Sequence, residues 1–215
     1  MNGCKSLSTP MAPKSIHSSH PDEPFNDPNL YRSIVGGLQY LTFTRPDIAF
    51  SVNYVCQHMH EPRTSHFQLV KRILRYVQGT ITHGIRLLAS NSLKLYGFSD
   101  ADWAGCPITR RSTTGYCTYL GRNCISWSAK KQPTVARSST EAEYRAMAST
   151  AAELTWLTYL LRDIGMYLDD PPTLYCDNIS ALHLTINPVF HARTKHIELD
   201  YHFVREKVAM ASRIL

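Results

Sequence analysis

The 215-residue sequence has no hydrophobic run long enough to cross a membrane. Its most apolar stretches, such as residues 151–161, are interrupted by polar side chains well before the roughly 20 residues that a membrane-spanning helix needs. The N-terminus lacks the continuous apolar core of a secretory signal, and Gly3 stands one place too late for myristoylation. These absences predict an intracellular protein without a membrane partner, and they leave cytoplasm and nucleus open.

Paired cysteines and several catalytic motifs are also missing. The six cysteines contain no Cys-x-x-Cys pair, so neither a zinc ribbon nor a disulfide framework is indicated, and we expect reduced thiols. There is no His-Glu-x-x-His motif, no Walker loop and no dinucleotide-binding glycine motif. The serines of residues 138–143 do not form a nucleophile elbow. Hydrolases that work by those mechanisms are therefore not supported.

The composition is that of a folded globular protein, with 43% hydrophobic and 19% charged residues. Lysine and arginine together number 23, against 17 aspartates and glutamates. This positive balance fits a polyanionic partner, although by itself it supports only non-specific attraction to nucleic acid.

The first 90 residues divide into two segments. Residues 1–28 are rich in Ser, Pro, His and Asn without periodicity, which predicts a flexible lead-in. Residues 29–90 carry apolar side chains at helical spacing, which predicts a module of about three helices. Pro46 interrupts the pattern, and Asp47 can cap the helix that follows.

Residues 91–215 have a different pattern. Three β-prone runs come first, at residues 93–99, 115–120 and 123–128, and Gly121-Arg122 forms a tight turn between the last two. A long helix, a short strand and two helices are expected next, at Ser139–Arg162, at 173–176, from about Asn178, and from about His196 to the end. The sequence therefore predicts an α/β domain with the order βββ-α-β-α-α.

Four acidic positions fall where this order brings elements together. Asp100 ends the first strand and Asp177 ends the strand at 173–176, while either Glu198 or Asp200 starts the last helix. Glu143 lies in the first turns of the long helix, on the face that packs against the sheet. A carboxylate that points inward is costly unless something pairs with it.

Glu141 has a structural explanation. Ser138-x-x-Glu141 matches a capping box, and Arg145 lies four residues further on for an ion pair. We therefore assign Glu141 to structure and Glu143 to chemistry.

Grouped carboxylates repel one another unless cations neutralise them, and oxygen-rich sites favour Mg²⁺ or Mn²⁺. Two such ions can activate water and stabilise the leaving oxygen in phosphodiester cleavage. The alternative is that the strand-end aspartates only cap turns and helices.

Several linked motifs resemble the ribonuclease H domain of copia-type retrotransposon Pol polyproteins. They are SDADWAG, RRSTTGY, SWSAKKQPTVARSSTEAEYRA, LYCDN and RTKHIELDYHFVRE, which together cover most of residues 91–208. Upstream, YRSIVGGLQYLTFTRPDIAF and the residues after it resemble the thumb and connection segment that joins the polymerase palm to that domain. The resemblance implies a ribonuclease H-like mixed sheet of three antiparallel strands and then parallel strands, flanked by helices. It also implies cleavage of the RNA strand of an RNA–DNA hybrid with two Mg²⁺ or Mn²⁺ ions, and possible assembly with other Pol fragments.

Carried over by position, the resemblance makes Asp100, Glu143 and Asp177 the first three catalytic and metal-binding carboxylates. The family pattern places the fourth directly after Lys-His-Ile, at Glu198, whereas helix phase favours Asp200. We keep both and rank Glu198 first.

Two further groups of residues have open roles. His196 and His191 precede the last helix, where a histidine can relay protons or be an ordinary loop residue. The candidate phosphate contacts, which can equally be solvated surface cations, are Arg72, Arg75, Lys130, Lys131 and Arg137.

The Tyr-x-Asp-Asp motif of polymerases occurs once, at Tyr167–Asp170, but Pro171-Pro172 follow it directly. Proline cannot donate to a strand ladder, so we expect a loop there and no polymerase activity. An integrase is disfavoured because its glutamate comes last on a helix, whereas Glu143 comes second here. The alternative from a different class is a catalytically silent, truncated transposon relic that at most binds nucleic acid.

Overall fold

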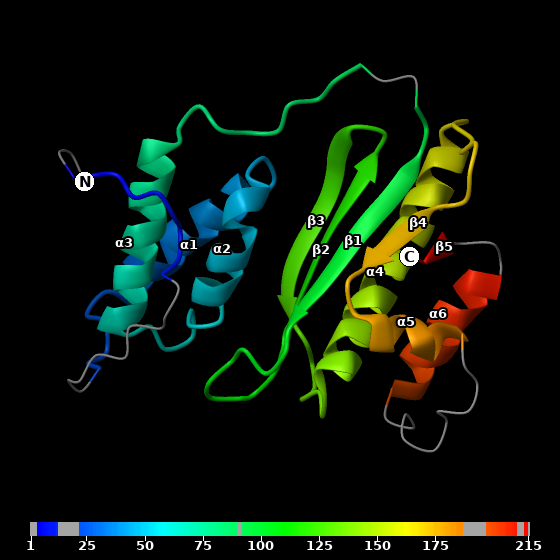
Figure 1. The fold of residues 1–215 in the computed structure, drawn as a ribbon. Coiled ribbons are helices and arrows are strands. Elements are labelled where there is room, and N and C mark those ends of the chain that lie inside the picture. The colour runs from blue at the N-terminus through cyan, green and yellow to red at the C-terminus, as the bar shows by residue number, and fades with distance from the viewer. Residues whose placement is uncertain (1–3, 13–21, 90–91, 187–196, 210–212, 215) are drawn as a thin grey trace. The chain divides into compact units, whose positions relative to one another are not determined.

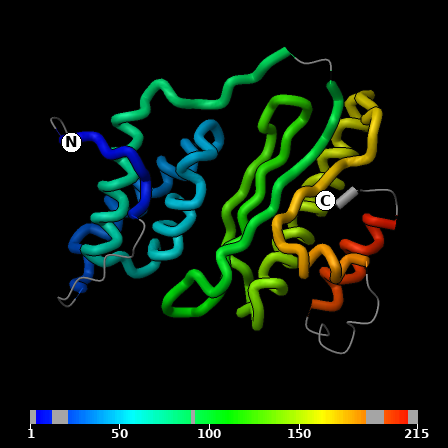
Figure 2. Tube along the Cα trace, viewed as in Figure 1, coloured from blue at the N-terminus to red at the C-terminus, as the bar shows by residue number. Residues whose placement is uncertain are grey.

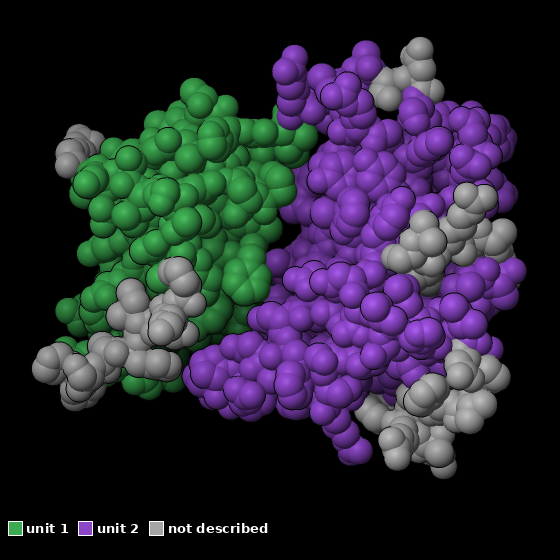
Figure 3. Space-filling view, in the orientation of Figure 1, with its two compact units in different colours: residues 1–85 green, residues 86–215 purple. Residues whose placement is uncertain are grey.

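The computed structural model describes residues 4–12, 22–89, 92–186, 197–209 and 213–214. The chain divides into two units, Met1–Ile85 and Arg86–Leu215 (Figure 3), and each is described by itself. The sequence pattern predicts a boundary after residue 90. The second unit begins earlier because the Leu88 backbone donates to Asn123 Oδ1 at 2.8 Å and accepts from Asn123 Nδ2 at 2.9 Å.

The first unit is helical, as predicted. Its described residues form α1 (Pro28–Leu41), the short 3₁₀ helix η1 (Pro46–Ile48), α2 (Ala49–Cys56) and α3 (Thr64–Gly79) (Figure 1). Apolar side chains from all four elements form its core, among them Tyr31, Val35, Ile48, Val52 and Ile73.

Asp47 does not cap α2, contrary to the prediction. α2 begins without a side-chain cap at Ile48. The Asp47 carboxylate instead accepts hydrogen bonds from the buried Arg45 guanidinium at 2.9 and 2.8 Å and from the Tyr76 hydroxyl at 2.8 Å. A charge-assisted pair with a buried cation is stronger than a hydrogen bond to a helix N–H. The Asp47 carboxylate therefore pairs with Arg45 and does not cap the helix.

Parts of the predicted lead-in are anchored to this unit. The Leu7 backbone N–H donates to Arg75 O at 3.4 Å, and the Phe25 N–H donates to Pro62 O at 2.9 Å. Phe25 also stacks on Phe67 with 4.2 Å between the ring centroids. The described residues of segment 1–28 are therefore held by contacts that its aperiodic composition does not reveal.

The second unit contains a five-stranded mixed sheet in the order β3-β2-β1-β4-β5 (Figures 1 and 2). Its strands are β1 (Leu95–Asp102), β2 (Thr113–Leu120), β3 (Asn123–Lys131), β4 (Thr173–Cys176) and β5 (Arg213–Ile214). The first three pair antiparallel, whereas β1 with β4 and β4 with β5 pair parallel. The predicted α/β class with a mixed sheet is confirmed.

Among the described residues, three helices accompany this sheet: α4 (Ser139–Asp163), α5 (Ile179–Ile186) and α6 (Glu198–Ala209). Met147 and Leu154 of α4 pack with Leu95 and Leu174 of the sheet and with Tyr201 of α6 in one core. α4 lies close to β1 at Gly97, where an added Cβ would stand 3.2 Å from the Thr150 methyl carbon. Glycine therefore permits the contact between helix and strand.

The end of the chain differs from the prediction of a helix running to the last residue. α6 ends at Ala209, and Arg213–Ile214 form a strand in which Arg213 pairs with Thr173 and Ile214 with Leu174. The outer edge of β4 offers unpaired backbone groups, and β5 satisfies them. In the described ranges no helix is both long and apolar enough to cross a membrane.

Candidate active site

Two strands bring Asp100 and Asp177 to the same end of the sheet. β1 and β4 are parallel neighbours, and their last paired residues are Ser99 and Cys176, so Asp100 in β1 and Asp177, which directly follows β4, lie at the same end. Both side chains are exposed. Asp100 lies inside β1, which continues to Asp102, rather than at its end as predicted.

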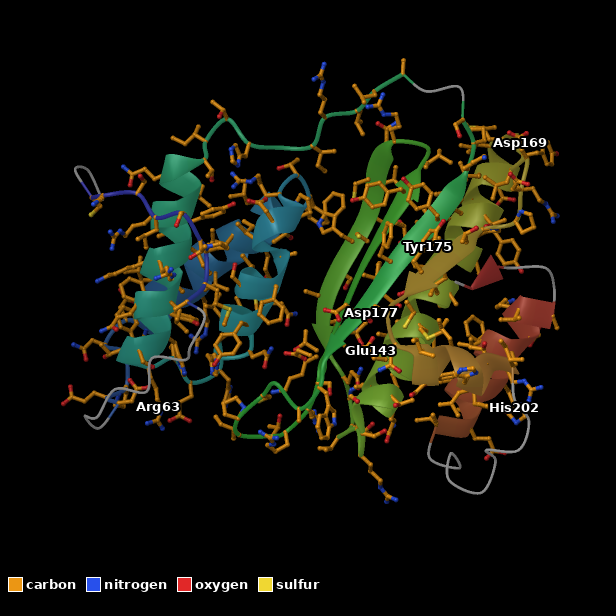
Figure 4. The ribbon with its side chains drawn as sticks, viewed as in Figure 1. Arg63, Glu143, Asp169, Tyr175, Asp177 and His202 are labelled. Carbon is orange, nitrogen blue, oxygen red and sulfur yellow. The ribbon has the colours of Figure 1, made fainter. Side chains whose placement is uncertain are left out.

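The start of α4 places Glu143 beside Asp177 (Figure 4), and both aspartates act electrostatically on it. The Ser138 side chain accepts from the Glu141 N–H at 3.2 Å, and the Glu141 carboxylate accepts from Arg145 at 2.9 Å. Glu141 also accepts from the Arg137 N–H at 2.8 Å, one residue before the position that a standard capping box uses. Glu141 is thereby held in structural contacts, and Glu143 faces the sheet.

Glu143 is a buried carboxylate with one unsatisfied oxygen. Its side chain is 7% exposed, and Oε1 accepts from the Ala101 backbone N–H at 3.2 Å. Oε2 has no hydrogen-bond partner among the described residues. Burial raises the pKa of Glu143 to about 7; the Ala101 hydrogen bond opposes this rise, and the negative charges of Asp100 and Asp177 add to it.

The donor set fits a divalent cation. One ligand atom from each of Glu143, Cys176 and Asp177 lies within 4.8 Å of the other two, and the exposed carboxylate of Asp100 acts electrostatically on the same Glu143. A buried, unpaired carboxylate oxygen beside two further carboxylates is stabilised by a positive ion. The residues present therefore suit Mg²⁺ or Mn²⁺.

No family model matches the chain, but individual proteins do. It is 53% identical over 204 residues to the retrovirus-related Pol polyprotein from transposon RE1 of Arabidopsis thaliana, which covers 95% of this chain and 14% of that polyprotein. The chain belongs to the copia-type Pol family. It spans about one seventh of the length of that curated relative.

This Pol region also resembles a shorter protein and a solved structure. It is 47% identical over 133 residues to secreted RxLR effector protein 161 of Plasmopara viticola, covering 61% of this chain and 94% of the effector. The structure of LC11-RNase H1, isolated from compost by a metagenomic approach, is 13% identical with a TM-score of 0.43, covering 57% of this chain and 83% of that one.

Neither candidate for the fourth carboxylate, Glu198 or Asp200, lies with Asp100, Glu143 and Asp177 in the structure. The Glu198 side chain is 65% exposed, and its Oε1 lies 3.9 Å from Nε2 of His202. Asp200 is half-buried; burial raises its pKa, and Arg145 opposes that rise. Neither acts on the pKa of Glu143. His191 and His196 lie outside the described residues.

Lys130 and Lys131 line a cleft of about 460 Å³ together with Arg145 and Asp200. The Lys131 ammonium also donates to Cys106 Sγ at 2.8 Å, and Arg137 is exposed. The cleft lining contains none of the three grouped carboxylates, so the role of these lysines as phosphate contacts stays a prediction.

In the first unit, both arginines proposed as phosphate contacts have partners within the chain. Arg72 donates to Thr9 Oγ1 and Arg75 donates to Lys5 O, each at 2.7 Å. A phosphate would have to displace or share these contacts, so their role in nucleic-acid binding stays a prediction.

The polymerase-like letters Tyr167–Asp170 lie in the loop between α4 and β4, as predicted. Asp169 lies at the opposite end of β4 from Asp177 (Figure 4).

Cys176 is the member of the cluster that sequence reasoning missed. Leu174 and Cys176 are buried whereas Tyr175 is exposed, so strand alternation directs the thiol toward the core. The available signal was its position directly before a strand-end aspartate.

Proposed function

We propose that the second unit hydrolyses the RNA strand of RNA–DNA hybrids with the help of divalent cations, as the ribonuclease H portion of a copia-type Pol polyprotein. The observation that carries this proposal is the convergence of Asp100, Glu143 and Asp177, with one Glu143 oxygen buried and unpaired. Carboxylates in this arrangement destabilise the folded protein when no cation is bound, and a bound cation would neutralise them.

The chain's own residues have distinct roles. Asp100 lies in β1 and Asp177 directly follows β4, and the two strands pair up to Ser99 and Cys176, so the ladder brings both carboxylates to the same end of the sheet. Glu143 is oriented by the Ala101 N–H and retains a proton up to about pH 7 in the metal-free protein. Two Mg²⁺ or Mn²⁺ ions, when bound, would supply activation of water and stabilisation of the leaving oxygen.

Hybrid recognition in this proposal uses backbone and 2′-hydroxyl contacts, so little sequence specificity is expected. Lys130, Lys131 and Arg137 are the proposed phosphate contacts in the second unit. Glu198, and Asp200 as its alternative, remain proposed as a fourth carboxylate that does not lie with the other three in the described geometry.

The test is cleavage of a labelled RNA–DNA hybrid by the full chain in Mg²⁺ or Mn²⁺, with a chelator control. Asp177→Asn should lower the cleavage rate by at least about 100-fold, because loss of groups that only support metal ligands already costs about 10–100-fold. Asp169→Asn is the matched control, because it removes the same charge from the α4–β4 loop and should cleave as the wild type does.

Glu198→Gln and Asp200→Asn in the same assay decide whether either residue takes part. A folded wild-type chain that leaves the hybrid intact would overturn the nuclease proposal. That result would favour the relic, which is supported by the similarity of 61% of this chain to an effector protein that is matched over 94% of its own length.

A further inference from the structure

The acidic group includes a thiol that the proposed nuclease does not use. Cys176 Sγ lies within 4.8 Å of a carboxylate oxygen of both Glu143 and Asp177. The Cys176 side chain is only 9% exposed, and the Asn178 backbone N–H donates to its sulfur at 3.4 Å. The thiol is thus fixed beside the carboxylates rather than turned away from them.

A separate observation indicates that this cluster is built to receive a ligand. Glu143 is 93% buried, and its Oε2 has no partner among the described residues. An oxygen in that condition favours a cation or a hydrogen-bond donor. Magnesium would use only the oxygens, because hard ions bind thiolates poorly, whereas zinc and cadmium favour sulfur.

We propose that Cys176, Glu143 and Asp177 form a binding site for a thiophilic divalent ion of the zinc class, which excludes Mg²⁺ from the same carboxylates. When the ion binds, the thiol proton and any proton on Glu143 leave to solvent, and bonds from the metal to sulfur and oxygen replace the S–H and O–H bonds. No oxidant or reductant is needed. Binding is independent of the proposed function, and only the resulting inhibition rests on it.

The geometry requires a small contraction. In a tetrahedral site with Zn–S of about 2.3 Å and Zn–O of about 2.1 Å, ligand atoms lie roughly 3.4–3.6 Å apart. The ligand atoms now lie within 4.8 Å of one another, and the exposed Asp177 side chain can turn to close the difference. Water would take the fourth position, as in zinc sites with three protein ligands.

Other thiols must be separated from this site. Cys117 and Cys124 lie on neighbouring strands and interact electrostatically with each other, so they can bind a soft ion as a pair. The experiment therefore uses the full chain carrying Cys117→Ser and Cys124→Ser as the parent, and compares it with the same chain carrying Cys176→Ser in addition.

The probe is Cd²⁺, titrated in the absence of nucleic acid and followed by the ultraviolet thiolate-to-cadmium charge-transfer band. The parent should bind one Cd²⁺ at the site, and Cys176→Ser should abolish that component of the band. Asp177→Asn should weaken it by at least about tenfold, and excess Mg²⁺ should compete with Cd²⁺. Tryptophan fluorescence checks that each variant is folded.

An unchanged band in the Cys176→Ser chain, or indifference of the band to Mg²⁺, would overturn the proposal. If Cys176→Ser unfolds, Glu143→Gln in the parent makes the same test, since it retains the thiol and removes a ligand charge. Where the hybrid is cleaved, the Zn²⁺ concentration that halves the rate should rise at least about tenfold in Cys176→Ser. A protein that binds Cd²⁺ as expected but cleaves no hybrid would contradict the proposed nuclease activity and would leave the proposed metal site standing.

Discussion

Replacing Glu143 by glutamine should stabilise the metal-free protein at alkaline pH. The pKa of Glu143 rises from the ordinary 4.5 to about 7 in the folded chain. Between these two pH values the folded state binds more protons than the unfolded state, so stability falls as pH rises and the full penalty is present above pH 7. A shift from 4.5 to about 7 corresponds to about 3 kcal/mol, at about 1.4 kcal/mol for each pH unit.

Glutamine escapes this penalty because it cannot ionise. Its amide oxygen can still accept from the Ala101 N–H, and its amide nitrogen can donate to the neighbouring aspartates. We therefore expect Glu143→Gln to exceed the wild type in unfolding free energy by about 3 kcal/mol at pH 8 in chelator. Near pH 4.5 the two proteins should differ little.

Urea denaturation followed by tryptophan fluorescence measures this difference in the relevant unit alone, because all three tryptophans (Trp103, Trp127 and Trp156) lie in the second unit. Glu141→Gln is the matched control and should destabilise at pH 8, since Glu141 pairs with Arg145. A Glu143→Gln effect of equal size at pH 4.5 and pH 8 would refute the reasoning, because it could not come from ionisation.

Three further outcomes are expected. Met147→Ala should lower the stability of the second unit by about 2–5 kcal/mol through a core cavity, while Met147→Leu should cost under about 1.5 kcal/mol; equal losses would argue against close packing under α4. Arg45→Ala should destabilise the first unit by about 3 kcal/mol by leaving Asp47 without its buried cation, seen as faster hydrogen exchange in α3 with the second unit unaffected. Although burial raises it, hydrogen bonds from Lys131 and Thr109 lower the pKa of Cys106 to about 7, so alkylation followed by mass spectrometry should modify Cys106 fastest at pH 7. Lys131→Ala should slow that reaction about tenfold, and an unchanged rate would show that the lysine does not stabilise the thiolate.

The sequence predicts those elements whose pattern is local. α4 repeats its apolar face over 25 residues, so both its extent and the inward direction of Glu143 follow from periodicity. The β2–β3 hairpin follows from its turn, where Gly121 adopts a positive φ of 58°.

Contacts between distant residues are the part that local pattern cannot give. Asp47 meets Tyr76 at a separation of 29 residues, and the two residues of β5 are too few to show alternation. Cys176 has the pattern of any core residue in a strand until α4 places Glu143 beside it. Helix phase within α6 likewise cannot show how that helix lies against α4, so it does not decide between Glu198 and Asp200.

The position of β1 in the middle of the sheet sets an order of assembly. On one side β1 pairs with β2 through a local connection, whereas on the other side it pairs with β4, which follows only after α4. Local hairpins close faster than pairings that span a long loop. During synthesis, a ribosome-bound chain that has not yet extended to Thr173 has an open edge on β1 and lacks Asp177. The negative charges that oppose ionisation of Glu143 thus come together only when β4 pairs with β1, after about half of the core residues of this unit have been synthesised.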